Sequence, residues 1–155
     1  MIRLGNSKIA KSAFIDVTGN GQLTLGNNCE VRHNAVLEVA GKVTIADNVV
    51  IGVGNWLQGS GEITIHKNVI IGPHCNIVST SHKYADVKKP IVEQGLEYGK
   101  ITIEQDAWIG AGVTIAMNVT IGKGAIIGAN SFVNKDVEPF AIYAGSPAVK
   151  IKSRK

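Results

Sequence analysis

The chain has 155 residues and a formal net charge of +4, and 45% of its residues are hydrophobic although only 5% are aromatic. That length suits one domain, and no apolar run approaches the roughly 20 residues of a membrane span. The start of the chain, Met1–Asn6, lacks the apolar segment of a secretory signal, so we expect a cytoplasmic protein. The basic residues have no aromatic platform beside them, which argues against nucleic acid as a partner.

Hydrophobic residues recur every six positions from the N-terminal part of the chain onward, in a weak form over residues 1–22. Residues 23–42, 43–62 and 63–82 align as three segments of 20, each with three hexapeptides and two extra residues. A period of six is typical of a parallel β-helix, in which each hexapeptide supplies one short strand and one turn. Three hexapeptides then form one triangular coil, and the extra residues form a ridge along one corner.

The repeat is interrupted once, over about residues 83–100, which include Pro90 and have no period of six. Such an insertion predicts a loop pushed out from the ridge. The strict repeat returns over 101–118 and 119–136, and residues 137–155 should cap or flank the last coil. We therefore expect one all-β domain over 1–155, with coils about 23–136.

Cys29 and Cys75 are too few to define a disulfide framework. Each lies two residues before a repeating apolar residue, Val31 or Ile77. This position suits a small side chain that points inward, so we expect both cysteines to be buried free thiols.

Four stretches carry a more specific signal than the repeat itself. They read IEQDAWIGAGVTI at 103–115, VTIG at 119–122, IGANSFVNKDV at 127–137 and AGSPA at 144–148. They resemble the hexapeptide-repeat acyltransferases, and among these the sugar and polysaccharide O-acetyltransferases most closely. The resemblance implies a left-handed parallel β-helix that assembles as a homotrimer. It also implies acetyl-CoA as co-substrate in the groove between neighbouring prisms, and a sugar or glycan hydroxyl as the acceptor.

A sugar hydroxyl is a poor nucleophile at neutral pH, and histidine is the side chain best suited to remove its proton. His33, His66 and His74 lie inside the coils at positions outside the apolar ladder, so we expect them on the solvated surface. His82 lies on the ridge where the loop begins, and the resemblance implies that it is the general base for direct transfer. The structural alternative is a corner histidine that only anchors the loop.

The resemblance also implies further site residues. The family has an Asn in the coil before the catalytic histidine, where this chain has Gly52; Asn55 is the nearest substitute, unless it makes a structural hydrogen bond. Val149 occupies the position of a basic residue, so Lys150 is the expected replacement. The residues implied to bind acetyl-CoA are Trp108, Ala111, Ala129, Asn134, Lys135, Lys150 and Lys152, although Trp108 could instead pack between subunits. For the acceptor we expect Tyr84, Asp86 and Gln94 of the loop, and no metal is required.

Three other interpretations remain open. A zinc hydratase on the same β-helix would need three histidines from neighbouring subunits, and the histidines here lack the paired spacing of that class. A catalytically silent scaffold would not need a histidine before an extruded loop. The acceptor could also be an amino group on a nucleotide sugar, which would make the protein an N-acetyltransferase. No integral membrane segment is expected.

Overall fold

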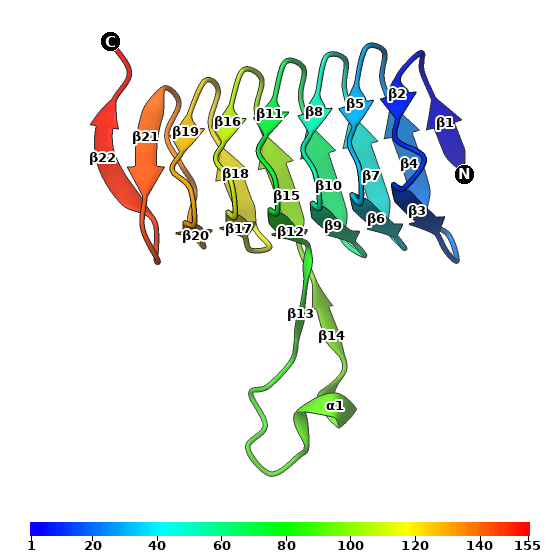
Figure 1. Cartoon of the computed structure of the whole chain (residues 1–155). Helices are drawn as coiled ribbons and strands as arrows, with labels where there is room; N and C mark the ends of the chain where they lie inside the picture. The colour runs from blue at the N-terminus through cyan, green and yellow to red at the C-terminus, as the bar shows by residue number, and fades with distance from the viewer.

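The computed structural model describes residues 1–155 and shows a parallel β-helix, which confirms the expected all-β fold (Figure 1). Each coil contributes one strand to each of three sheets, called here A, B and C, and the chain visits them in that order. No helix has the length and apolar character needed to cross a membrane.

The three sheets are built from short strands stacked in sequence order. Sheet A contains β1 (Ile2–Leu4), β4 (Gln22–Leu25), β7 (Lys42–Ile45), β10 (Glu62–Ile65), β15 (Lys100–Ile103) and β18 (Val119–Ile121). Sheet B contains β2 (Lys8–Ile9), β5 (Glu30–Val31), β8 (Val50–Ile51), β11 (Ile70–Ile71), β16 (Trp108–Ile109), β19 (Ile126–Ile127), β21 (Ala141–Ala144) and β22 (Val149–Ser153). Sheet C contains β3 (Phe14–Val17), β6 (Val36–Val39), β9 (Trp56–Gly59), β12 (Asn76–Val78), β17 (Thr114–Ile115) and β20 (Phe132–Val133).

The core consists of the apolar residues that recur every six positions. Ile45, Ile65, Ile103 and Ile121 lie in register on neighbouring strands of sheet A, and each is completely buried. Stacking identical branched side chains in this way removes a continuous column of apolar surface from water, which stabilises the coils. Cys29 and Cys75 are buried free thiols, as the sequence predicts.

Asparagine allows the tight corner between sheets A and B. Asn28, Asn48, Asn68 and Asp106 adopt positive φ values between 55° and 62° at equivalent points of successive coils. Asn and Asp tolerate this left-handed conformation better than other residues with a side chain. Asn48 Nδ2 also donates to Asn68 Oδ1 at 3.0 Å, so these side chains bridge neighbouring coils.

The outer faces of the three sheets differ in polarity. Sheet A is polar, because a row of threonines runs along it in register, flanked by the ion pair between Lys100 and Glu62 at 3.2 Å. The row consists of Thr24, Thr44, Thr64, Thr102 and Thr120. Sheets B and C instead expose large hydrophobic side chains, namely Ile70, Trp108, Phe14, Trp56 and Phe132.

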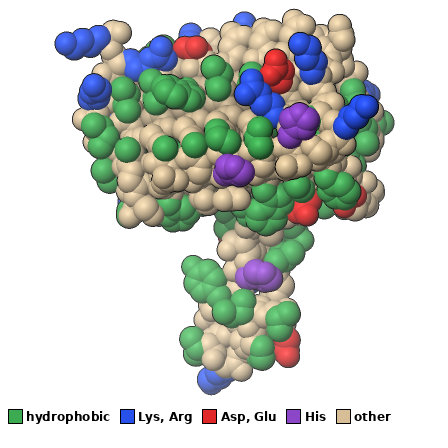
Figure 2. Space-filling model, viewed as in Figure 1, with side chains coloured by type: hydrophobic (Ala, Val, Ile, Leu, Met, Phe, Trp, Pro, Cys, Tyr) green, Lys and Arg blue, Asp and Glu red, His purple; other side chains and the backbone are tan.

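The inserted segment is an arm that stands clear of the prism (Figures 1 and 2). It has secondary structure of its own: β13 (Thr80–His82) pairs in antiparallel fashion with β14 (Leu96–Tyr98), and the short helix α1 (Ile91–Gln94) lies near the tip. The structure confirms the extruded segment expected at about 83–100 and defines its ends more closely. The arm begins at Thr80 and ends before Lys100, which already belongs to sheet A, because antiparallel pairing recruits residues on both sides of the break in the repeat.

The C-terminal segment continues sheet B and then turns back on it. β21 pairs in parallel with β19, and β22 pairs in antiparallel fashion with β21. Arg154 fixes this end of the chain, because its guanidinium donates to the carbonyl of Gly124 at 2.8 Å and lies 3.4 Å from the carboxylate of Asp106. This hairpin forms the flank of the last coil that the sequence predicts.

Candidate active site

The base of the arm is fixed by a cluster of hydrogen bonds around Ser79, a fully buried residue just before β13. Its hydroxyl accepts from the amide of Gly61 at 3.0 Å and donates to the carbonyl of Gln58 at 2.9 Å. Its carbonyl accepts from the amide of Gly99 at 2.8 Å. A Cβ on Gly61 would lie 2.2 Å from the carbonyl oxygen of Gly99, so only glycine permits this close approach. The two chain segments of the arm therefore leave the ridge from a defined point.

His82 is the last residue of β13 and lies opposite Leu96 on the other strand of the arm. Its side chain is exposed. Three residues beyond Ser79, His82 lies on the part of the arm that projects from the prism (Figure 1).

Two of the other three histidines have side-chain partners in the coils. His33 Nδ1 lies 3.0 Å from the hydroxyl of Ser12, and His66 Nε2 lies 3.9 Å from a carboxylate oxygen of Glu104. His74 occupies a corner with a φ of 57°. None of the three belongs to the arm.

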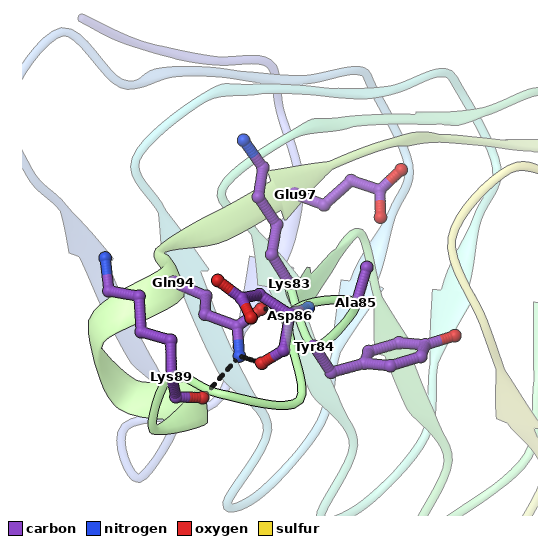
Figure 3. Close-up of a pocket in the computed structure, with 7 residues that line it drawn as sticks. All are labelled: Lys83, Tyr84, Ala85, Asp86, Lys89, Gln94 and Glu97. Carbon is purple, nitrogen blue, oxygen red and sulfur yellow. Dashed lines mark hydrogen bonds between the residues drawn. The ribbon is translucent and has the colours of Figure 1, made fainter.

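Tyr84, Asp86 and Gln94 line a hollow of about 520 Å³ near the tip of the arm (Figure 3). Gln94 is used internally: its Oε1 accepts from the amide of Asp86 at 3.1 Å, and its Nε2 donates to the carbonyls of Asp86 and Lys89 at 2.8 and 2.7 Å. Its role in this structure is to brace the tip. Tyr84 is 70% exposed and points away from the hydrogen bonds of Gln94 (Figure 3).

Asn55 lies inside the prism and does not reach the ridge. Its Nδ2 donates to the carbonyl of Gly52 at 3.0 Å, and its Oδ1 accepts from the amide of Cys75 at 2.6 Å. The side chain is completely buried. These contacts match the structural alternative for Asn55, because both polar ends bind the backbone of the corner between sheets B and C.

Two of the residues implied to bind the co-substrate share one row on the outer face of sheet B. Trp108, Ile126, Ile142 and Lys152 are in register on four neighbouring strands. Neighbouring strands lie about 4.8 Å apart, so the row from Trp108 to Lys152 is about 14 Å long. It presents an exposed aromatic ring at one end and an exposed cation at the other.

Ala111 and Ala129 lie at the corner between sheets B and C, beside this row. The carbonyl of Ala111 accepts from the amide of Asn130 at 2.8 Å, so the two corners stack directly. A Cβ on Gly72 would lie 2.8 Å from the nitrogen of Ala111, and one on Gly110 would lie 2.7 Å from the nitrogen of Ala129. Both alanines are exposed.

The remaining residues implied to bind acetyl-CoA differ in their surroundings. Asn134 and Lys135 lie at the corner between sheets C and A, on the same edge of the prism as the arm, and are exposed. Lys150 forms an ion pair with Glu138 on the surface. The hydrogen bond from the Lys150 ammonium to Glu138 raises the pKa of Lys150.

Within one chain, the candidate residues fall into two groups. Asn134 and Lys135 lie at the edge between sheets C and A, and the arm that carries His82 leaves from the same edge, whereas the alanine corners lie on the other side of sheet C. A strand of four residues is about 13 Å long, so the width of sheet C separates the groups. A single chain therefore does not bring His82 next to Ala111 and Ala129.

Sequence reasoning overlooked three residues on the arm that lie near His82: Thr80, Leu96 and Tyr98. The signal for them was the alternation of apolar and polar residues over Leu96-Glu97-Tyr98, which is typical of a strand. It also overlooked Ser79, which occupies an inward position that is otherwise apolar or glycine in the stacked coils.

Comparisons with known proteins agree with this architecture. Residues 100–135 match the family described as bacterial transferase hexapeptide (six repeats). A protein named "Probable macrolide acetyltransferase" from Lysinibacillus sphaericus is 54% identical over 65 residues, which are 42% of this chain and 36% of that protein. A galactoside O-acetyltransferase from Lactococcus lactis subsp. lactis is 35% identical over 79 residues, 50% of this chain and 37% of that protein. The chain thus spans little more than a third of the length of these relatives.

Solved structures extend the similarity to the whole chain. AntD, an N-acyltransferase from Bacillus cereus solved with dTDP and 3-hydroxybutyryl-CoA, is 28% identical with a TM-score of 0.85, covering 99% of this chain and 83% of that one. A maltose O-acetyltransferase from Clostridium difficile 630 shares the fold with a TM-score of 0.62 and 23% identity, covering 100% and 67%. This chain therefore contains the hexapeptide repeat over residues 100–135 and resembles the acyltransferases built on this repeat, sugar acyltransferases among them.

Proposed function

We propose that this chain is an acyltransferase that moves the acetyl group of acetyl-CoA to a hydroxyl of a sugar or polysaccharide precursor. The observation that carries the proposal is the placement of His82, exposed on an arm whose base is fixed to the ridge by Ser79. The acetyltransferase names of the relatives support the reaction class. The proposed location is the cytoplasm, which fits acetyl-CoA as the donor.

The reaction proceeds by direct transfer. His82 accepts the proton of the acceptor hydroxyl as its oxygen attacks the carbonyl carbon of the thioester. The tetrahedral oxyanion is stabilised by a hydrogen-bond donor, for which an exposed backbone N–H at a coil corner is suited. The C–S bond then breaks, and the CoA sulfur takes the proton back from the imidazolium of His82. The thiols of Cys29 and Cys75 are buried in the core, so neither is placed to form an acetyl-enzyme.

Acetyl-CoA is proposed to lie along the corner between sheets B and C. Trp108 packs against the pantetheine arm, and the backbone of Ala111 and Ala129 hydrogen-bonds to it. Lys152 attracts the CoA phosphates as a point charge. Lys150 attracts the CoA phosphates less strongly than Lys152 does, because the carboxylate of Glu138 already compensates the charge of Lys150.

We propose a homotrimer in which the neighbouring chain completes this site with Asn134, Lys135 and His82. The separation of the two residue groups by sheet C supports such a partner. A cyclic trimer joins two different surfaces of the same chain, and the two exposed apolar faces, on sheets B and C, supply them. The polar face of sheet A, with its ion pair between Lys100 and Glu62, would remain in water.

Tyr84 and Asp86 on the arm are proposed to hydrogen-bond the acceptor. Gln94 contributes indirectly by bracing the tip that carries them. Asn55 likewise acts through the backbone, because it holds the corner of Gly52 against that of Cys75 and so keeps neighbouring coils in register.

A second candidate is N-acylation of an amino sugar linked to a nucleotide. It is favoured by the similarity to AntD over almost the whole chain, because a structure of that enzyme contains dTDP-4-amino-4,6-dideoxyglucose and coenzyme A. The same arm and base would serve this reaction, with the amino nitrogen as nucleophile.

The proposal is tested by measuring CoA release from acetyl-CoA with a panel of sugars, amino sugars and nucleotide sugars. Acceptor-dependent release supports acyl transfer, and mass spectrometry then identifies the product. Mild alkali cleaves an ester but leaves an amide intact, so it separates O-acetylation from N-acetylation. An absence of CoA binding together with an absence of release for every acceptor would contradict the proposal and favour a scaffold.

A further inference from the structure

The arm has two chemically different faces. In an antiparallel pair, directly opposite residues project to the same face, and residues two apart on one strand do so as well. Thr80 lies opposite Tyr98, and His82 lies opposite Leu96, so these four side chains share one face. Ser81 and Glu97 occupy the other face. Lys83 extends to the same side as Glu97 (Figure 3).

The face that carries His82 offers an aromatic ring at a useful distance. Tyr98 is diagonal to His82 across the pair, which places it about 7–8 Å away and within reach of an aromatic side chain. Tyr98 is 59% exposed and Leu96 is 39% exposed, so neither is used to pack the arm against its own prism. An exposed aromatic residue beside an exposed base is a surface that a small molecule could cover.

A polar group on the same face also lacks a partner. The hydroxyl oxygen of Thr80 is buried and forms no hydrogen bond, and the same holds for Oε1 of Gln58 on sheet C. Because this Thr80 oxygen is shielded from solvent, a molecule on the exposed face of the arm does not contact it, and Thr80 lies beside the exposed surface without being part of it. Thr80 is two residues from His82 on the same face, a distance of about 7 Å.

We propose that Tyr98 forms the floor of the acceptor subsite beside His82, with its ring stacking on the apolar face of a pyranose ring. This inference rests on the proposed acyl transfer and names the residue that would orient its acceptor. The carbon-bound hydrogens of a sugar ring pack well against an aromatic face, while the ring hydroxyls point to the sides. A pyranose on Tyr98 would place one hydroxyl toward His82. Tyr98 is therefore a specificity residue, and His82 remains the base.

The test compares Tyr98→Ala and Tyr98→Phe with Val92→Ala, a control at an exposed position of α1 that does not line the hollow of Figure 3. For Tyr98→Ala we expect the acceptor KM to rise about 10-fold, with the KM for acetyl-CoA unchanged, because only the stacking surface is removed. Tyr98→Phe keeps the ring and should retain the wild-type acceptor KM, as should Val92→Ala. An unchanged acceptor KM in Tyr98→Ala would overturn the proposal.

Binding is measured separately from turnover by saturation-transfer NMR of the sugars in the presence of CoA. Saturation transfer that is lost in Tyr98→Ala supports the proposed acceptor subsite. If the wild type binds the sugars in this way but transfers no acetyl group, the proposed acyl transfer fails and the subsite stands. The proposed subsite is contradicted if the wild-type protein binds none of the sugars. It is also contradicted if saturation transfer survives in Tyr98→Ala. Sedimentation of Tyr98→Ala provides the last check. Dissociation of the assembly would show that a neighbouring chain, and not an acceptor, covers this face.

Discussion

The hydroxyl of Ser79 accepts a hydrogen bond from the amide nitrogen of Gly61 at 3.0 Å and so ties the base of the arm to the preceding coil. The Ser79→Ala variant lacks this hydroxyl, so the part-buried amide of Gly61 loses its hydrogen-bond partner. We expect the free energy of unfolding to fall by about 1–3 kcal/mol, as measured by urea denaturation. The value of kcat should also fall, because His82 is held only three residues away. The exposed Ser146→Ala serves as control and should leave both quantities unchanged.

Asn55 is expected to matter for stability more than for chemistry. In Asn55→Ala the amide of Cys75 and the carbonyl of Gly52 both lose their side-chain partner inside the prism. We expect a loss of about 1–3 kcal/mol in the free energy of unfolding. At a temperature where the variant is fully folded, its kcat should remain near that of the wild type. A folded variant with a kcat lowered 100-fold would instead indicate direct participation in catalysis.

Lys152 and Lys150 should differ in their effect on the co-substrate. Lys152 ends the row that begins at Trp108, whereas Lys150 is already paired with Glu138. We expect Lys152→Ala to raise the KM for acetyl-CoA about 5- to 10-fold, an effect that shrinks as salt screens the phosphates. Lys150→Ala should change this KM by less than Lys152→Ala does. Equal effects in the two variants would contradict the assignment.

The apolar outer face of sheet B is expected to hold the assembly together. Ile70 is 51% exposed on this face, so Ile70→Glu places a charge where a neighbouring chain should pack. We expect the variant to sediment as a smaller species than the wild type. Thr24→Glu introduces the same charge on the polar face of sheet A and should leave the sedimentation coefficient unchanged. Dissociation by Thr24→Glu but not by Ile70→Glu would reverse the proposed arrangement.

The thiol of Cys75 predicts a loss of stability at alkaline pH. Burial raises the pKa of Cys75 above its ordinary value of 9.0, in spite of backbone hydrogen bonds that lower it. The folded state thus favours the neutral thiol, and this contribution to stability is present below pH 9.0 and lost as the pH rises further. Urea denaturation between pH 8 and 10 should show the decline. Cys75→Ala, which places in this corner the residue that Ala35 has in another coil, should show a shallower decline.

The sequence predicted the coils well because their determinants are local and repeated. The spacing of Ile103, Ile109 and Ile115 reports directly which side chains point inward, and all three are completely buried. The same spacing located the buried thiols of Cys29 and Cys75. A feature that recurs in every coil occurs at many positions in the sequence, so a chance match at one position does not obscure it.

The arm and the site were harder to predict because their determinants occur once. The pairing of β13 with β14 depends on contacts between residues 14–18 positions apart, and no repeat marks its register. The expected sugar-binding role of Gln94 followed from its polarity, but its amide is engaged by Asp86 and Lys89. The internal contacts of Asn55 and the pairing of Lys150 with Glu138 likewise depend on three-dimensional neighbours that spacing along the chain does not identify.

The account depends most directly on His82 as the base. The decisive measurement is kcat for acceptor-dependent CoA release by His82→Gln, with CoA affinity measured by calorimetry on the same preparation. The account predicts a kcat lowered by about 100-fold or more with CoA binding unchanged, because glutamine keeps a polar side chain but cannot accept the proton. A variant that binds CoA and turns over near the wild-type rate would contradict the role of His82.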